Sequence, residues 1–130
     1  PLDDKEWEAM RRHPESGADL ARGSDALEGA APIIAAHHER YDGRGYPAGL
    51  RGEAIPLGAR IVSAADVYDA LTTARPYKRA FSHDEAVALL RDQSATALDP
   101  RVVKSFIAIP YYALAQAASR YGVVLLEAAS

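Results

Sequence analysis

The 130-residue chain contains no cysteine. Disulfides, zinc fingers, iron–sulfur clusters and thiol catalysis are therefore excluded, and the composition fits a reducing cytoplasm. The chain also lacks an apolar run of the ~20 residues that a membrane span needs, because a proline and three polar residues interrupt its most apolar window, 107–126. No secretory signal is present. These absences predict a cytoplasmic protein with no direct membrane insertion.

Strong positive charge is absent as well. The formal net charge of −3 gives no electrostatic footprint for DNA or RNA, so any phosphate binding must come from a local basic cluster. With 48% hydrophobic and 25% charged residues, the composition is ordinary for one globular domain. The chain opens on Pro1 rather than Met. A piece of a longer polypeptide and removal of Met before proline both explain that start.

Capping and helix-breaking residues predict an all-α domain without repeats or internal linkers. A first helix is expected from residue 3 or 4 to about 23, with a break at His13-Pro14 because proline fits poorly inside a helix. A second helix is expected over about 25–41. Residues 42–56 are expected to form a loop, since glycine and proline are too frequent there for a helix or a strand.

Three further helices and a tail complete the expected bundle of about five or six helices. Pro56 suits the start of a third helix. Residues 82–85 form a capping box that opens a fourth, and Asp99-Pro100 is typical of the N-cap and first residue of a fifth. The Ala-rich segment 111–128 is expected to be helical, with a short strand over 123–126 as the alternative.

Two adjacent histidines, His37 and His38, precede the glycine-rich loop. On a helix their side chains diverge by ~100°, so they suit two metal ions of one cluster, one imidazole each, better than one shared ion. Taken alone, such a pair is more often an ordinary core or surface feature. His13, beside the expected helix break, could turn toward the same site, whereas His83 is expected on a solvent face and receives no chemical role.

Acidic and basic side chains further along the chain could complete such a site. Asp66 is expected among apolar residues, where a carboxylate is rarely left unpaired, so it either binds metal or pairs with Arg60. Asp69 either orients a ligand imidazole or has a capping or bridging role. Arg75 and Lys78 could hold phosphate, the first bidentately and the second as a point charge, although any surface pair looks similar.

The loop beginning at Asp42 reads Gly43-Arg44-Gly45-Tyr46-Pro47. Its glycines either supply positive φ angles for a tight turn or let the backbone approach a ligand, while Tyr46 offers a ring and a hydroxyl. No strand precedes the loop, so this is not a dinucleotide-binding fingerprint.

Taken together, these segments resemble the HD-GYP family of bacterial cyclic-di-GMP phosphodiesterases, a branch of the HD metal-dependent phosphohydrolases. The match is strongest over residues 1–106 of the single domain expected over 1–130, which leaves 107–130 as an extra helical tail. The ordered motifs that carry the resemblance are His13-Pro14-Glu15-Ser16-Gly17, His37-His38-Glu39, Asp42-Gly43-Arg44-Gly45-Tyr46-Pro47, Ala65-Asp66 with Tyr68-Asp69-Ala70-Leu71-Thr72, and Arg75-Pro76-Tyr77-Lys78.

The resemblance implies a helical bundle of the HD-domain type that holds two or three metal ions, usually iron or manganese. A metal-bound hydroxide would open cyclic-di-GMP to pGpG or GMP, so no protein nucleophile is expected. The implied metal ligands are His13, His37, His38 and Asp66. The implied substrate-binding residues are Tyr46, Arg75 and Lys78, and the residues in supporting or structural positions are Asp42, Asp69, Gly43, Gly45 and Pro47.

The chain departs from the family in two places. The family carries a His-Asp dyad followed by Lys, upstream of the His-Pro-x-x-Gly segment, and no such dyad occurs here. We therefore expect an N-terminally truncated bundle that binds metal weakly and is nearly inactive, or alternatively a non-catalytic module that binds a nucleotide or a protein partner. In addition, Ser94–Ala97 stands where the family usually has a glycine, which affects the local turn.

The resemblance and the missing helices also predict how the chain associates. An upstream sensory or receiver domain is compatible with the family. Uncovered apolar surface favours association, so a homo-oligomer is expected, with the segment 111–126 as its contact.

Overall fold

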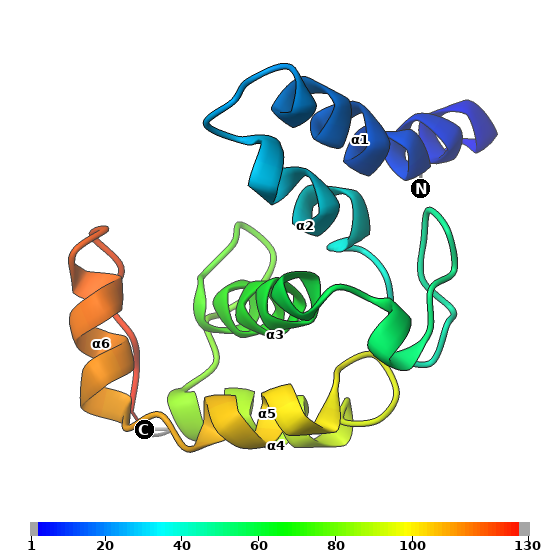
Figure 1. Cartoon of the computed structure of the whole chain (residues 1–130). Coiled ribbons are helices and arrows are strands. Elements are labelled where there is room, and N and C mark those ends of the chain that lie inside the picture. The colour runs from blue at the N-terminus through cyan, green and yellow to red at the C-terminus, as the bar shows by residue number, and fades with distance from the viewer. Residues whose placement is uncertain (1–2, 128–130) are drawn as a thin grey trace.

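The computed structural model describes residues 3–127, which form six α-helices, two short 3-10 helices and no β-strand (Figure 1). The α-helices are α1 (Asp4–Arg22), α2 (Ala31–Ala36), α3 (Leu57–Thr72), α4 (His83–Asp92), α5 (Pro100–Ile107) and α6 (Tyr111–Ser119). The predicted all-α class and helix number are confirmed. None of the helices in this described part is long and apolar enough to cross a membrane.

The first helix does not break at proline. α1 continues through Pro14, so the predicted interruption is wrong. Proline has no N–H to bond the carbonyl four residues earlier, which here belongs to Met10. The His13 ring replaces that partner, because its Nδ1 donates to the Met10 carbonyl at 2.5 Å. The Pro14 ring itself is fully buried, which ties the middle of α1 to the bundle.

The second helix is shorter than predicted. Residues 28–30 form a 3-10 turn, α2 follows, and His37 is its C-cap residue, so the expected extension to residue 41 is wrong. The N–H groups of Tyr41 and Asp42 bond to carbonyls of the α4–α5 connection at 3.1 and 2.8 Å. Because these N–H groups bond to a segment more than 50 residues away, they cannot continue the hydrogen bonds of α2, and the helix ends.

The three central helices begin where the sequence predicts. Pro56 is the N-cap of α3, Ser82 and Glu85 form the capping box of α4, and Asp99 caps α5. Their apolar side chains build the largest core cluster, in which Leu90 is fully buried. In Figure 1 these helices form the lower part of the molecule, and the packed pair α1 and α2 lies above α3.

The turn between α4 and α5 contains an alanine in the left-handed region. Ala95 has φ +65°, and its N–H donates to the Leu98 carbonyl at 2.9 Å. This is the segment in which the resemblance described above leads us to expect glycine. Alanine therefore forms the turn that a glycine would form, but in a backbone conformation that residues with a Cβ disfavour.

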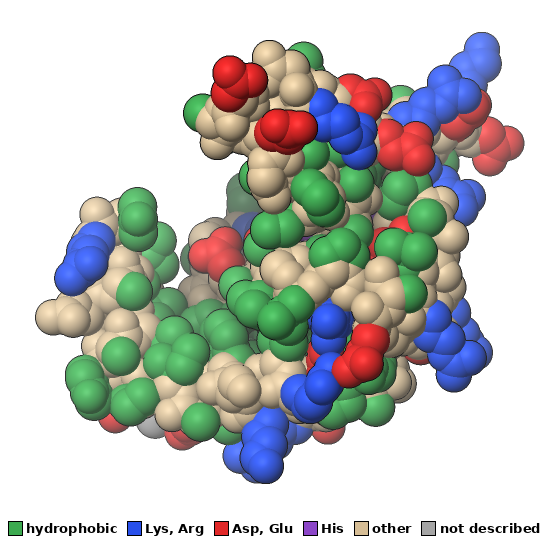
Figure 2. All heavy atoms as spheres, in the orientation of Figure 1, with side chains coloured by type: hydrophobic (Ala, Val, Ile, Leu, Met, Phe, Trp, Pro, Cys, Tyr) green, Lys and Arg blue, Asp and Glu red, His purple; other side chains and the backbone are tan. Residues whose placement is uncertain are grey.

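The C-terminal segment is helical only in part. α6 ends at Ser119, and residues 123–127 are extended without strand pairing, so the fully helical tail and the alternative strand are both wrong for the described residues; Ala128 lies outside them. The Tyr111 hydroxyl donates to the Leu125 carbonyl at 2.7 Å, and Leu125 packs into the core cluster. Hydrophobic side chains remain exposed on this arm (Figure 2), among them Tyr112 and Val124.

Candidate metal centre

Three histidines from two helices meet at one corner of the molecule. His13 comes from α1, and His37 and His38 lie at the C-terminal end of α2. One nitrogen of each ring lies within 4.8 Å of the others, and the Nε2 atoms of His13 and His38 are 3.1 Å apart. The ring centroids of His37 and His38 are only 4.0 Å apart. The predicted divergence of these two rings is therefore wrong, because the helix ends at His37.

Backbone carbonyls hold two of the rings. Nδ1 of His13 bonds to the Met10 carbonyl, and Nδ1 of His37 bonds to the Ile34 carbonyl at 2.6 Å. A carbonyl can only accept, so the Nδ1 of His13 and of His37 carries the proton and the Nε2 carries a lone pair, which in His13 faces Nε2 of His38 at 3.1 Å. Imidazoles that bind metal are commonly oriented in this way. Three imidazoles with an open fourth position form a known donor set for a divalent cation, so these residues fit a metal ion.

The surroundings of His38 favour its neutral form. Burial lowers the pKa of His38, the neighbouring rings of His37 and His13 lower it further, and Asp66 acts in the opposite direction. A neutral ring is the form that offers its lone pair to a metal.

Asp66 faces the same corner without joining the cluster. It influences His38 electrostatically, but its carboxylate is not among the ligand atoms that lie within 4.8 Å of one another. The aspartate is exposed, so the prediction of an apolar environment is wrong. The alternative pairing with Arg60 is also wrong, because Arg60 bonds Asp99 at 2.6 Å. Within residues 3–127 the Asp66 carboxylate has no ion pair.

The glycine-rich loop places a tyrosine against the histidines. Tyr46 stacks on His38, with ring centroids 5.0 Å apart and an interplanar angle of 19°. A Cβ on Gly45 would lie 2.3 Å from the Arg40 nitrogen, so only glycine permits this close backbone approach. Gly43 has φ +81°, as a tight turn requires. The tight-turn alternative for the glycines is therefore confirmed, whereas the close approach at Gly45 is to the backbone of this chain, and approach to a ligand stays a prediction.

A residue without a predicted role anchors this loop. Glu39 is 3% exposed, and its two carboxylate oxygens accept from the N–H groups of Ala48 and Leu50 at 2.7 and 3.0 Å. These bonds hold the half-buried Pro47 and its neighbours next to the end of α2. In the sequence, the only hint of this anchoring role is that Glu39 directly follows the histidine pair. The burial of its carboxylate in the structure reveals the role.

The two aspartates expected in supporting positions act locally. Asp42 accepts two bonds from Arg40, at 3.1 and 2.7 Å, and one from the Arg44 N–H. The Arg40 bond is the main reason that the pKa of Asp42 falls to about 2. Asp69 approaches the Thr73 hydroxyl at 3.5 Å near the end of α3, and among the described residues it bonds no histidine.

Arg75 and Lys78 share one tight turn. Their backbone N–H and carbonyl groups bond each other in both directions at 2.9 Å. Lys78 Nζ donates to the carbonyls of Ala70 and Leu71 at 2.5 and 3.3 Å, so this amine caps the C-terminus of α3. Arg75 is exposed. Neither side chain bonds to the histidine cluster within the described residues.

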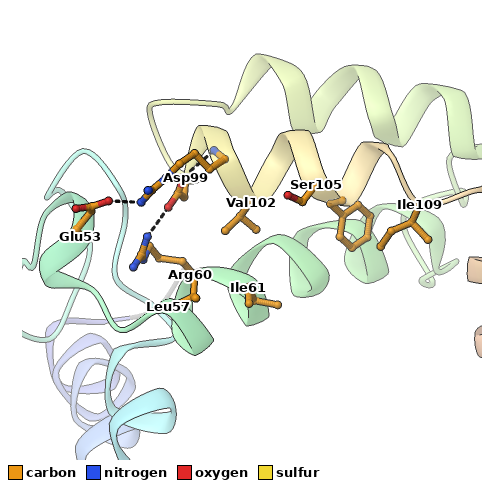
Figure 3. A pocket seen from close by; sticks show the side chains of 10 residues that line it. Glu53, Leu57, Arg60, Ile61, Asp99, Val102, Ser105 and Ile109 are labelled. Atoms are coloured by element: carbon orange, nitrogen blue, oxygen red, sulfur yellow. Dashed lines mark hydrogen bonds and ion pairs between the residues drawn. The ribbon is translucent and has the colours of Figure 1, made fainter.

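A larger cavity of about 810 Å³ lies away from the histidines, between α3 and α5 (Figure 3). Two ion pairs, Arg60 with Asp99 and Arg101 with Glu53, lie at its polar end, and apolar side chains line the remainder. Its charged groups already have partners, and the histidine cluster is the only group of three potential metal ligands in the described part of the chain. The candidate centre is therefore the histidine corner.

Known proteins resemble this chain over most of its length. A family model for the HD domain matches residues 1–102. The cyclic di-GMP phosphodiesterase response regulator RpfG of Xanthomonas campestris pv. campestris is 51% identical over 108 residues, which cover 82% of this chain and 29% of that protein. A cyclic di-GMP phosphodiesterase of Vibrio cholerae is 45% identical over 115 residues, 83% of this chain and 23% of that protein.

A comparison with solved structures agrees with these sequence similarities. The crystal structure of a cyclic GMP-AMP-specific phosphodiesterase of Vibrio cholerae (V-cGAP3) matches with a TM-score of 0.71 and 27% identity, over 92% of this chain and 28% of that one. The chain thus spans less than a third of the length of these relatives. A divalent metal fits both the relatives and the three-histidine cluster. Fold, ordered motifs and similarity together assign the chain to the HD-GYP branch of the HD-domain family.

Proposed function

We propose that this chain is part of a metal-dependent phosphodiesterase domain that hydrolyses cyclic-di-GMP to pGpG or GMP. The observation that carries the proposal is the convergence of three imidazoles, two of which donate Nδ1–H to backbone carbonyls and turn Nε2 toward one point. Relatives named as cyclic di-GMP phosphodiesterases support the substrate.

His13, His37 and His38 would hold the first metal ion, and Asp66 would serve a second. Iron or manganese would suit this mixed set of imidazole and carboxylate donors. A bound divalent ion supplies charge neutralisation for the phosphoryl group and a water of low pKa. The carbonyl partners of His13 and His37 fix the direction of the lone pairs of these two rings before any ion arrives.

Other side chains would position the substrate. The Tyr46 ring stacks on His38, and among the described residues its hydroxyl has no hydrogen-bond partner, so this hydroxyl would be available to a substrate held beside the histidines. Arg75 is exposed and can grip a phosphate bidentately. Lys78 already donates to the α3 carbonyls, so we assign it a supporting role unless the substrate draws it away.

One observation favours the second candidate function, a nucleotide-binding module without hydrolysis. No carboxylate lies in the cluster, and three imidazoles suit a single ion better than the pair that clamps an in-line displacement. Turnover by the isolated chain is therefore expected to be slow or absent. A single domain over 1–130, an N-terminal truncation, a cytoplasmic location, a homo-oligomer and an upstream sensory or receiver domain stay predictions.

Metal titration and product analysis test the proposal together. The chain is loaded anaerobically with Fe²⁺ or with Mn²⁺, bound metal is measured by elemental analysis, and cyclic-di-GMP products are separated by chromatography. We expect about one tightly held ion, lost in His38→Ala and kept in the matched control His83→Ala, whose ring lies outside the cluster.

The outcomes separate the candidates. Slow formation of pGpG or GMP that disappears in His38→Ala supports the phosphodiesterase. Metal and nucleotide binding without any product supports the module. Equal metal binding by His38→Ala and the unmodified chain contradicts the proposed centre.

A further inference from the structure

A cavity of about 480 Å³ opens beside the histidine cluster. It shares His38 and Tyr46 with that corner, and its remaining wall comes from the first turns of α1 and from the segment around the glycine-rich loop. Its volume lies in the range of small-molecule sites. The side chains that give it chemical character are Trp7, Arg11, Arg40 and Arg44.

The cavity wall is positive in a chain that is negative overall. Three guanidinium groups line it, and no acidic residue does. Arg40 is neutralised by Asp42, but Arg11 and Arg44 form no ion pair within residues 3–127. Arg11 and Arg44 therefore line this space without an ion-pair partner among the described residues, and a guanidinium matches the geometry of a phosphate.

The same wall carries an aromatic ring that does not pack into the core. Trp7 is 50% exposed, whereas the residues by which α1 enters the core are Pro14, Ala18 and Ala21. Trp7 and Arg11 are four residues apart on α1, so they lie on one face of the helix. An indole with a free face is a stacking platform for a base of any sequence.

We propose that Trp7, Arg11 and Arg44 form a nucleotide-recognition subsite that stacks one base and binds one phosphate of the substrate. The inference rests on the proposed function and extends it. A cyclic dinucleotide has two phosphates and two bases, and hydrolysis engages only one phosphate at the metals. The other half of the molecule needs a second site, and this cavity adjoins the centre through His38 and Tyr46.

Trp7 is the only tryptophan, so its fluorescence reports on this cavity alone. Cyclic-di-GMP is titrated into the chain with and without Zn²⁺, free N-acetyltryptophanamide corrects for absorption, and calorimetry gives the dissociation constant independently. We expect saturable quenching of Trp7. Arg11→Gln and Arg44→Gln are each expected to weaken binding about tenfold and to reduce its salt dependence.

Arg12→Gln is the matched control. Arg12 neighbours Arg11 on the same helix, but it is paired with Glu8 and does not line the cavity. It is expected to bind nucleotide like the unmodified chain. Trp7→Ala, followed by calorimetry, is expected to lose about tenfold in affinity, while Trp7→Phe retains most of it. Circular dichroism checks that each variant keeps its helices.

The outcomes distinguish the subsite from the function. Nucleotide binding without quenching, or equal affinities for Arg11→Gln, Arg44→Gln and Arg12→Gln, overturns the subsite and leaves the phosphodiesterase proposal intact. Hydrolysis of bis(p-nitrophenyl) phosphate, which has no base to stack, tests the metal centre alone. Metal binding with no nucleotide binding at all overturns both the subsite and the proposed substrate.

Discussion

The histidine corner and the Arg60–Asp99 pair use polar side chains in opposite ways. Asp99 is 1% exposed, and its carboxylate accepts from Arg60 at 2.6 Å and from the Arg101 N–H at 2.8 Å. The rings of His13 and His38, by contrast, are exposed or half-buried, and their Nε2 atoms face each other. The Arg60–Asp99 pair is bonded internally and to backbone N–H groups, whereas the Nε2 atoms of the histidine corner bond to nothing outside the corner among the described residues, so a ligand can replace their mutual contact.

The pKa of each group reflects this difference. Burial raises the pKa of Asp99, but the bonds from Arg60 and from the backbone N–H groups of Arg101 and Val102 outweigh burial and leave the pKa lowered. At His38 burial and the other rings act together to lower the pKa. Each shift favours the form the site uses, a paired carboxylate in one case and a neutral imidazole in the other.

The largest expected effect is the loss of the buried ion pair. Asp99→Ala removes the partner of Arg60 and the N-cap of α5, and we expect unfolding free energy to fall by about 3–5 kcal/mol in urea denaturation. Glu53→Gln removes the exposed partner of Arg101 and should cost at most about 1 kcal/mol. Equal losses in the two variants would contradict the contrast between buried and exposed pairs.

The Arg60–Asp99 ion pair also makes the unfolding free energy depend on pH under acidic conditions. Because the pKa of Asp99 is lowered by folding, its contribution is present above the ordinary aspartate pKa and is lost as pH falls through the folded value. Denaturation at a series of pH values below about 4 should therefore show a shallower decline for Asp99→Asn than for the unmodified chain.

The next effect is on metal binding. His37→Ala is expected to lower metal affinity by at least about 100-fold, while the unfolding free energy of the metal-free chain changes by less than about 1 kcal/mol. Calorimetric metal titration and urea denaturation in EDTA measure the two quantities. A stability loss as large as that of Asp99→Ala would mean that the histidines are structural.

Glu39 combines the two kinds of region, since it is buried like Asp99 but lies in the histidine corner. Glu39→Gln leaves one of the two loop N–H groups without its acceptor, and we expect a loss of about 1–3 kcal/mol in stability. Because the loop carries Tyr46, nucleotide affinity should fall while metal affinity is retained. Glu15→Gln, an exposed change on α1, is the control, and an unchanged nucleotide affinity in Glu39→Gln would contradict the anchoring role.

The smallest expected effect is an increase in the unfolding free energy. Ala95→Gly relieves the left-handed backbone at φ +65°, and we expect about 1 kcal/mol of added stability in thermal or urea unfolding. Ala88→Gly, on the exposed side of α4, is the matched control and should lose a similar amount. A loss in both variants would show that the turn is not strained.

Local signals in the sequence predicted local structure correctly. The capping box at Ser82 and the Asp99-Pro100 pair act within one helical turn, so the residues next to them determine the outcome. The signals failed where a side chain replaced a backbone donor or where a distant segment supplied hydrogen-bond partners. Pro14 stays inside α1 because the His13 ring replaces the missing N–H, and α2 ends early because Tyr41 and Asp42 bond to another segment.

Side-chain partners also differ in whether the sequence could predict them. Arg60 was six residues from Asp66, which made a pairing plausible, but it bonds Asp99, 39 residues further on. The sequence identified the histidines, Tyr46 and the glycines, because residue type and order carry that chemistry. It could not identify the burial of Glu39 or the alignment of Trp7, Arg11 and Arg44 along one cavity.

The sequence by itself determined the helical class, the starts of the capped helices α1, α3, α4 and α5 and the candidate metal ligands, because capping, periodicity and donor chemistry are properties of short segments. Only the tertiary structure decided that three imidazoles from α1 and α2 share one point, and that Asp66 stays outside it. The reason is physical: ligand geometry depends on how helices end and pack, and that packing is set by contacts between residues far apart in the chain.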